Sequence, residues 1–201
     1  MNLYELGIIN ECKNRKYNEQ LIAFILAQVK VESANYTKFR ENLNYTTMDR
    51  LMDVFGKRFD KLQLSQEQIN KCIKNPEYLA NTVYANRMGN INADDGYKFR
   101  GAFLPQITGR DMFSQVSKII GIDLINNLDK LDIKDVDLNV KVTLAFCDIK
   151  FAKLNLDKYD TIEEFSIIWN GGKNGLNERT EAYKYYTNKL QNTWHYSLTI
   201  V

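Results

Sequence analysis

Histidine is scarce in this 201-residue sequence, which has one histidine, three cysteines and two prolines. A zinc hydrolase with two or three histidine ligands is therefore excluded. A Ser-His-Asp or Cys-His site would have to use His195, which we interpret instead as part of an amphipathic tail that packs on the domain. The P-loop and GxGxxG patterns are absent, so phosphate binding has no support. Hydrolytic chemistry in this chain would rest on carboxylates.

The cysteines Cys12, Cys72 and Cys147 lie far apart and form no CxxC pair. This spacing favours free, buried, reduced thiols and synthesis in the cytosol. No apolar run approaches the roughly 18 residues of a membrane span. The segment MNLYELGIINECKNRK lacks the basic start and apolar stretch of a signal peptide, so we expect another component to export or release the protein if its target is external.

The composition is that of a folded domain, with 44% hydrophobic and 26% charged residues. Its length fits one domain over residues 1–201, with room for two lobes. The formal net charge of +2 is far below that of a dedicated nucleic-acid binder, so we expect no nucleic-acid partner. A mildly basic chain is compatible with an anionic polymer such as a bacterial cell wall.

Capping residues predict where several helices begin. Asn2 with Glu5 forms a capping box for a helix that runs to about Lys13. Asn18 caps EQLIAFILAQVKVES, which carries the apolar stripe of a buried helix. The same signals predict further helices: Ser65 before QEQINKCIKN, Pro76 in PEYLANTVYANRM, Thr108 before GRDMFSQVSKII with Gly121 as its stop, Thr161 with Glu164 before EEFSIIWN, and Asn177 before ERTEAYKYYTNKLQ.

The segment LNVKVTLAFCDIKFAKL is apolar on several sides and is predicted to be the central, most buried helix. The total is seven or eight helices, with at most a short β-hairpin in DGYKFRGAF. The segment NINADDG is a turn rather than a calcium loop, because its glycine is one place late and no glutamate closes it. The sequence therefore predicts a mainly α fold.

Two glutamates in contrasting settings lie in AQVKVESANYTKFRENLNYTT. Glu32 ends an apolar helical run, where the helix dipole and apolar surroundings disfavour a negative charge and favour the protonated acid. Glu41 lies in a polar segment and can stay hydrated and ionised. An acid and a base of this kind perform glycoside hydrolysis, although solvated surface carboxylates are the usual alternative. Nearby segments rich in amides, hydroxyls and aromatic rings suit sugar binding, and Asn-rich turns alone would also explain many of them.

The segments AQVKVES, ENLNY, YANRMGN, DGYKFRG, QITGRDMF and WNGGKNGLNER occur in this order. Together they resemble the family 19 glycoside hydrolases, a chitinase-like group that includes many phage endolysins, over roughly residues 20 to 190. The resemblance implies a lysozyme-like helical fold with a central cleft between two lobes. It also implies hydrolysis of a β-1,4 bond with inversion, without metal or cofactor.

By position, Glu32 resembles the family's general acid and Glu41 the general base of its endolysin branch. Inversion requires the two carboxyl groups to be about 6.5–9.5 Å apart. The resemblance assigns other roles as follows: Gln106 and Thr108 orient substrate or water, Asn170 binds a sugar, Asn44 and Tyr45 line the cleft, and Arg179 holds and tunes the acid. From residue type alone, Gln106 and Asn170 could equally be amides that satisfy backbone groups, and Arg179 a surface ion pair.

The sequence departs from the family pattern at three places, one of which is Pro105, where an aliphatic residue is common in endolysins although some chitinases carry proline. Val31 stands where the family usually has histidine, and Ala102-Phe103 stands where a second Arg-Gly is usual. These changes could weaken sugar binding, alter the substrate or mark a chain that lost activity. The two retained glutamates favour an active enzyme.

We expect a peptidoglycan hydrolase of the endolysin or muramidase type, which cuts the bond between N-acetylmuramic acid and N-acetylglucosamine. It would be a monomeric single catalytic domain without a wall-binding module, made in the host cytoplasm and released by a holin-like route. Two alternatives stay open: a chitinase acting on chitin or chitooligosaccharides, and an inactive sugar-binding or lysis-regulating homologue.

Overall fold

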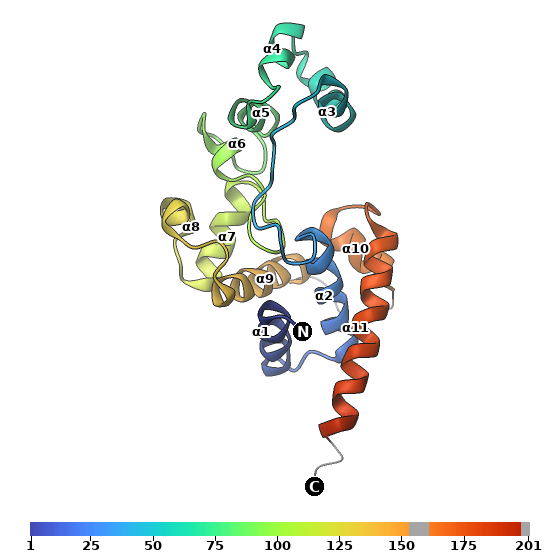
Figure 1. The fold of residues 1–201 in the computed structure, drawn as a ribbon. Coiled ribbons are helices and arrows are strands. Elements are labelled where there is room, and N and C mark those ends of the chain that lie inside the picture. The colour runs from blue at the N-terminus through green and yellow to red at the C-terminus, as the bar shows by residue number, and fades with distance from the viewer. Residues whose placement is uncertain (153–160, 198–201) are drawn as a thin grey trace. The chain divides into compact units, whose positions relative to one another are not determined.

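The structure is a computed structural model that describes residues 1–152 and 161–197, with side chains through residue 192. This part of the chain contains eleven α-helices and one short 3-10 helix (Figure 1). Extended pairing within it is confined to two isolated bridges, Arg40 with Ala102 and Ala102 with Ile107. The predicted mainly α fold is confirmed.

The chain forms two compact units, and each is built from separated segments. Unit 1 comprises residues 1–39, 103–106 and 132–201, and unit 2 comprises residues 40–102 and 107–131. The whole of unit 2 is therefore inserted between the first and last segments of unit 1.

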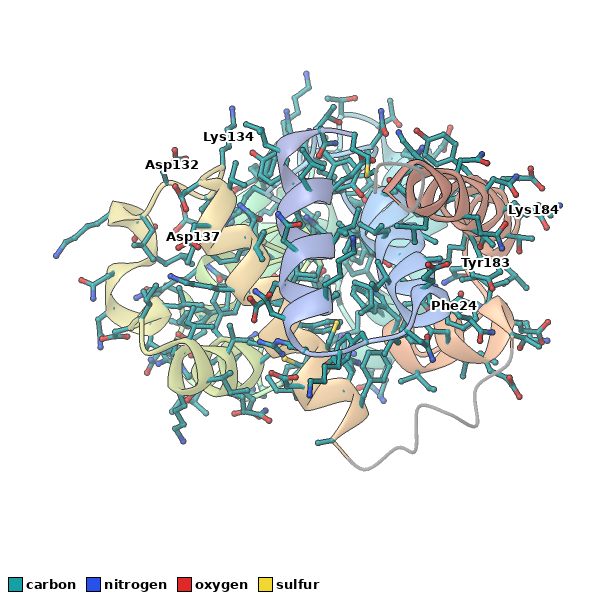
Figure 2. The ribbon with its side chains drawn as sticks, turned by 90° about the horizontal axis from the view of Figure 1, so that it is seen from below. Phe24, Asp132, Lys134, Asp137, Tyr183 and Lys184 are labelled. Atoms are coloured by element: carbon teal, nitrogen blue, oxygen red, sulfur yellow. The ribbon has the colours of Figure 1, made fainter. Side chains whose placement is uncertain are left out.

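Unit 1 contains five of the helices: α1 (Leu3–Asn14), α2 (Glu19–Glu32), α9 (Val136–Phe151), α10 (Ile162–Asn170) and α11 (Leu176–Ser197). Helix α2 is buried over nearly its whole length, and its main partner is α11. Phe24 of α2 stacks on Tyr183 of α11 at 4.5 Å between ring centroids, and Figure 2 shows the two rings facing each other. Helix α9 is buried on several sides, as predicted.

A buried polar cluster ties α1 to α11. The Tyr186 hydroxyl donates to Glu5 Oε1 at 2.5 Å, and the Tyr36 and Tyr186 hydroxyl oxygens are 3.0 Å apart. Burial, followed by the neighbouring Tyr36 and Glu5, raises the pKa of Tyr186 well above its usual range. Because the proton of Tyr186 is committed to Glu5, Tyr36 must be the donor between the two hydroxyls.

Unit 2 contains the remaining elements: α3 (Met48–Leu62), α4 (Gln66–Lys71), α5 (Pro76–Val83), α6 (Asp95–Lys98), α7 (Arg110–Ile120), α8 (Leu124–Asn127) and the 3-10 helix η1 (Leu128–Lys130). One apolar cluster joins α3, α4 and α5, and includes Leu51, Phe59, Ile69 and Leu79. Helices α5 and α6 pack closely at Gly96, where a Cβ atom would lie 2.4 Å from the carbonyl oxygen of Ala80.

A buried ion pair connects α6 to α7. The Asp95 side chain is fully buried, accepts from Arg110 Nε at 2.8 Å, and also accepts from the backbone N–H groups of Ile91 and Asn92. Burial by itself raises the pKa of this carboxyl, but the Arg110 and backbone hydrogen bonds outweigh burial and hold it well below its ordinary value.

Most of the predicted caps are confirmed, because a cap depends on neighbouring residues. Asn2 with Glu5, Ser65 and Thr161 with Glu164 form capping boxes, and Asn18 caps α2. Two predicted caps are wrong. Gly109, and not Thr108, occupies the N-cap of α7, while α11 begins at Leu176 and thus includes Asn177.

Three other expectations need correction. The hairpin predicted in DGYKFRGAF is wrong, because its first residues form α6 and its later residues make only the isolated bridges. Helix α5 ends at Val83 and not near Met88, because Asn86 and Met88 have positive φ and cannot continue a right-handed helix. Helix α3 was not predicted, although Thr47 caps it and its apolar positions follow a helical stripe.

The three cysteines are free and buried, as the spacing predicted. Burial raises the pKa of the Cys12 thiol to about 12. Within residues 1–152 and 161–197, no helix is both long and apolar enough to cross a membrane. The side chain of His195 lies outside the described part of the chain, so its predicted packing is not tested.

Replacing Asp95 by Asn should lower the free energy of unfolding by about 3–5 kcal/mol, because it leaves the Arg110 guanidinium without its buried counter-charge. Urea unfolding monitored by circular dichroism measures this. The control Glu67→Gln, which breaks an exposed ion pair with Lys71, should change stability by less than about 1 kcal/mol. Equal losses in both variants would contradict this assignment.

The same pair predicts a pH dependence. The folded-state pKa of Asp95 lies below its unfolded value, so its stabilisation is complete above about pH 5 and declines as pH falls towards the folded pKa. The free energy of unfolding of the wild type should therefore fall on acidification below about pH 4, and that of Asp95→Asn should fall less steeply.

Candidate active site

Glu32 is the last residue of α2, and two hydrogen bonds of the Ser33 hydroxyl hold the backbone where the helix ends. The Ser33 hydroxyl donates to the Val29 carbonyl at 2.7 Å and accepts from the Tyr36 N–H at 2.8 Å. Ala34, Asn35 and Tyr36 then all have positive φ, so the chain leaves the helix through a left-handed turn. The buried Ser33 thus fixes the backbone that carries Glu32.

The Glu32 carboxylate forms an ion pair with Arg179 of α11. Arg179 Nη2 lies 2.6 Å from Glu32 Oε1, and the exposed fractions of the two side chains are 5% and 21%. Arg179 Nη1 donates to Oε1 of Gln28, and Arg179 Nε donates to the Asn174 carbonyl at 3.1 Å. The contact between Arg179 and Glu32 agrees with the role that the family resemblance assigned to Arg179. The alternative of a surface ion pair is wrong, because Arg179 is buried.

Gln28 extends this network into α10. It lies one helical turn before Glu32 and donates from Nε2 to the Ser166 hydroxyl at 2.8 Å, while Ser166 donates to the Ile162 carbonyl. Gln28 and Ser166 are both fully buried. Three helices, α2, α10 and α11, therefore meet at the side chains that hold Glu32.

Asn170 is connected to the same network through the loop between α10 and α11. Its Oδ1 accepts from the Gly172 N–H at 2.9 Å, and its Nδ2 donates to the Asn174 carbonyl at 3.4 Å. That carbonyl is also the acceptor for Arg179 Nε. Gly171 ends α10 with a φ of 81°, which lets the loop turn back. The Asn170 side chain is exposed and so is available to a ligand.

Gln106 also belongs to unit 1, in the short segment 103–106. Its Nε2 donates to the Phe103 carbonyl at 2.8 Å and to the Lys38 carbonyl at 3.4 Å. The structure thus gives Gln106 the backbone contacts of the alternative raised from its residue type. Its half-buried side chain holds two stretches of unit 1 together.

Glu41 lies in unit 2, where hydrogen bonds reach both of its carboxylate oxygens. Tyr84 donates to Oε1 at 2.9 Å and the Gly101 N–H donates to Oε2 at 3.1 Å. The Glu41 N–H also donates to the Gly101 carbonyl at 2.8 Å. Burial and then the Glu41 charge raise the pKa of Tyr84 well above its ordinary value, so Tyr84 remains a hydrogen-bond donor.

The other predicted site residues of unit 2, Asn44, Tyr45 and Thr108, differ in exposure. Asn44 is exposed, and its N–H donates to Asn42 Oδ1 at 2.9 Å. Tyr45 is half-buried against Phe55, and burial followed by the Glu41 charge raises its pKa. Thr108 is half-buried and precedes the N-cap of α7.

The predicted site residues divide between the units. Glu32, Gln106, Asn170 and Arg179 belong to unit 1, whereas Glu41, Asn44, Tyr45 and Thr108 belong to unit 2. The separation of the two carboxyl groups stays a prediction. Residue-type reasoning missed Tyr84 and Gln28. Gln28 left a signal, because it is the one polar residue in the apolar run from Leu21 to Val29.

No protein-family model matches the chain. A Haemophilus influenzae protein named "Glycosyl hydrolase family 19 domain-containing protein" is 35% identical over 171 residues, which cover 83% of this chain and 78% of that relative. The chain belongs to glycosyl hydrolase family 19. This confirms the resemblance found in the sequence motifs and places the chain among glycoside hydrolases of the chitinase- and lysozyme-like group.

In this family 19 member, replacing Arg179 by Lys should lower the free energy of unfolding by about 1–3 kcal/mol. Lysine keeps the charge but cannot donate to Glu32, Gln28 and the Asn174 carbonyl at once, so buried acceptors lose partners. Denaturant unfolding measures the change. The control Arg50→Lys, at an exposed position of α3, should change stability by less than about 0.5 kcal/mol.

Proposed function

We propose that this chain is a peptidoglycan hydrolase of the endolysin type, which cleaves the β-1,4 bond between N-acetylmuramic acid and N-acetylglucosamine with inversion. The observation that carries the proposal is the Glu32 carboxyl group, held at a helix end by a buried arginine in a chain of family 19. A second carboxylate, Glu41, is held at both oxygens by neutral donors. Two carboxyl groups in different settings are what an inverting glycosidase requires.

Glu32 acts as the general acid in this proposal. Arg179 holds Oε1, while Oε2 makes no hydrogen bond to a residue of the described ranges. In this proposal Oε2 is the oxygen that delivers a proton to the leaving glycosidic oxygen. Gln28 and Asn174 complete the partners of the guanidinium, so Arg179 positions the acid and does not touch the sugar itself.

Glu41 acts as the general base. Tyr84 and the Gly101 N–H occupy one lone pair on each carboxylate oxygen, which leaves further lone pairs for a water molecule. The two donors also fix the plane of the carboxylate. In this proposal Glu41 takes a proton from a water that attacks the sugar on the face opposite the leaving group.

Other predicted site residues supply substrate contacts in this proposal. Asn170 and Asn44 offer exposed side-chain amides to N-acetyl and hydroxyl groups, and Tyr45 offers a ring for sugar stacking. Gln106 and Thr108 orient substrate or water.

Two observations support peptidoglycan over chitin as the substrate. The three cysteines are free, so the chain lacks the disulfide framework common in secreted plant chitinases, and its mildly basic charge suits an anionic wall. Ala102 and Phe103, which stand where the family usually has a second Arg-Gly, are fully buried. We further propose a monomeric catalytic domain that reaches the wall by a holin-like route.

Glu32→Gln and Glu41→Gln should each lower the rate of wall lysis by about 100-fold or more, because each removes a group that transfers a proton. Turbidity loss of purified cell wall measures the rate, and circular dichroism checks folding. Mass spectrometry of wild-type digests should show reducing N-acetylmuramic acid ends. Release from chitin without wall lysis would favour the chitinase alternative, and a wild type inactive on both would support the inactive homologue.

Tyr84→Phe should lower kcat about tenfold with a small change in KM, because only the hydroxyl that orients Glu41 is lost. Steady-state kinetics on solubilised wall fragments separate the two parameters. Tyr78→Phe is the matched control, because Tyr78 lies in α5, whose C-cap is Tyr84, and it should keep wild-type kcat. A Tyr84→Phe variant with wild-type kcat would remove Tyr84 from the proposed machinery.

A further inference from the structure

A groove of about 400 Å³ lies on unit 1 between the C-terminal end of α2 and the first half of α11. Its lining residues are Lys30, Val31, Ala34 and Asn35 at the end of α2, and Glu178, Glu181, Ala182 and Tyr185 of α11. Val31 and Glu178 are the sequence neighbours of Glu32 and Arg179. The groove therefore begins one residue away from each partner of the ion pair that holds the proposed acid.

Part of the groove lining is apolar. Val31, Ala34 and Ala182 contribute methyl groups, and Tyr185, which is 44% exposed, contributes its ring. The residues on α11 follow the spacing i, i+3, i+4, i+7, so they share one face of the helix. Such a surface can hold a short extended chain with small side chains.

One end of the groove is cationic. Lys30 Nζ lies 4.3 Å from the centroid of the Tyr185 ring, and Lys189 donates to the Tyr185 hydroxyl at 2.6 Å. No carboxylate of the described residues lies within 4 Å of the Lys30 ammonium group. Lys30 is thus positioned by an aromatic ring and left without an anion.

The other end is anionic. Glu178 is exposed, and among residues 1–152 and 161–192 no cation lies within 4 Å of its carboxylate. Seven residues separate Glu178 from Tyr185, which places the two ends about 10 Å apart along α11. Glu181, between them, is paired with Lys184.

We propose that this groove binds the peptide stem of peptidoglycan, a short chain that carries both carboxylates and a free amino group. The proposal rests on the proposed function and deepens it. Three or four extended residues span about 10–14 Å, which matches the distance between the charged ends. A stem carboxylate pairs with Lys30 and the stem amine with Glu178. Chitin, an uncharged polymer, would leave both charges unpaired, so the groove selects peptide-bearing glycan.

Calorimetric titration with the synthetic stem N-acetyl-L-Ala-γ-D-Glu-diaminopimelate-D-Ala, whose one free amine is on diaminopimelate, tests the groove directly on the full chain. Lys30→Met and Glu178→Gln should each weaken binding about fivefold, the effect expected for one partly exposed charge pair. Lys134→Met is the matched control, because Lys134 is exposed and lies on the far side of α1 from α11 in Figure 2. It should bind the peptide as the wild type does.

A change on the ligand separates the two ends. Acetylating the free amine of the stem should weaken binding to wild type and to Lys30→Met, but should make no further difference to Glu178→Gln, because the paired carboxylate is already gone. Equal affinity of wild type, Lys30→Met and Glu178→Gln for the stem would overturn the proposal, as would an acetylation effect that is the same in all three.

Activity measurements distinguish the groove from the proposed function. The ratio of kcat/KM on peptide-bearing glycan to that on amidase-stripped glycan should fall about fivefold in Lys30→Met and stay at the wild-type value in Lys134→Met. A wild type that lyses walls but binds no stem overturns the groove alone. A wild type that binds the stem in the predicted pattern but cuts no glycan supports the groove and overturns the proposed function.

Discussion

The buried guanidinium of Arg179 is the constraint on which the arrangement of unit 1 depends. Its three nitrogens donate to Glu32, Gln28 and the Asn174 carbonyl, which come from α2 and from the loop after α10. A cation removed from water is costly unless every donor has a partner. Any shift of α2 against α11 would leave at least one of these groups without its hydrogen-bond partner. The ion pair and the apolar packing therefore both hold the two helices in a single register.

Around Arg179, apolar packing supplies most of the stabilisation, and the hydrogen-bonded polar groups fix the positions of the helices. Phe24 stacks on Phe165 and on Tyr183, and Gln28 links Arg179 to the Ser166 hydroxyl by hydrogen bonds. Unit 2 repeats the principle on a smaller scale, where Asp95 and Arg110 fix α6 against α7. Each unit therefore combines an apolar cluster with one buried ion pair.

The sequence predicted contacts between residues close in the chain, such as helix caps, but not contacts between residues that only folding brings together. The capping boxes at Asn2, Ser65 and Thr161 were predictable because each closes within three residues. The partnership of Tyr84 with Glu41 spans 43 positions and has no periodicity to reveal it. The omission of α3 is a different error, since its cap and stripe are visible in the sequence. The two carboxyl groups were identified by motif, while the neighbours that hold them required coordinates.

The discontinuous path of the chain bears on how the protein matures on the ribosome. Glu32 and Arg179 are separated by 147 positions, and all of unit 2 is synthesised between them. Unit 2 can complete its core before α11, the last helix of unit 1, has been synthesised. Unit 1 can close around the ion pair only after translation has passed Arg179, so a nascent or prematurely terminated chain carries an unsupported Glu32.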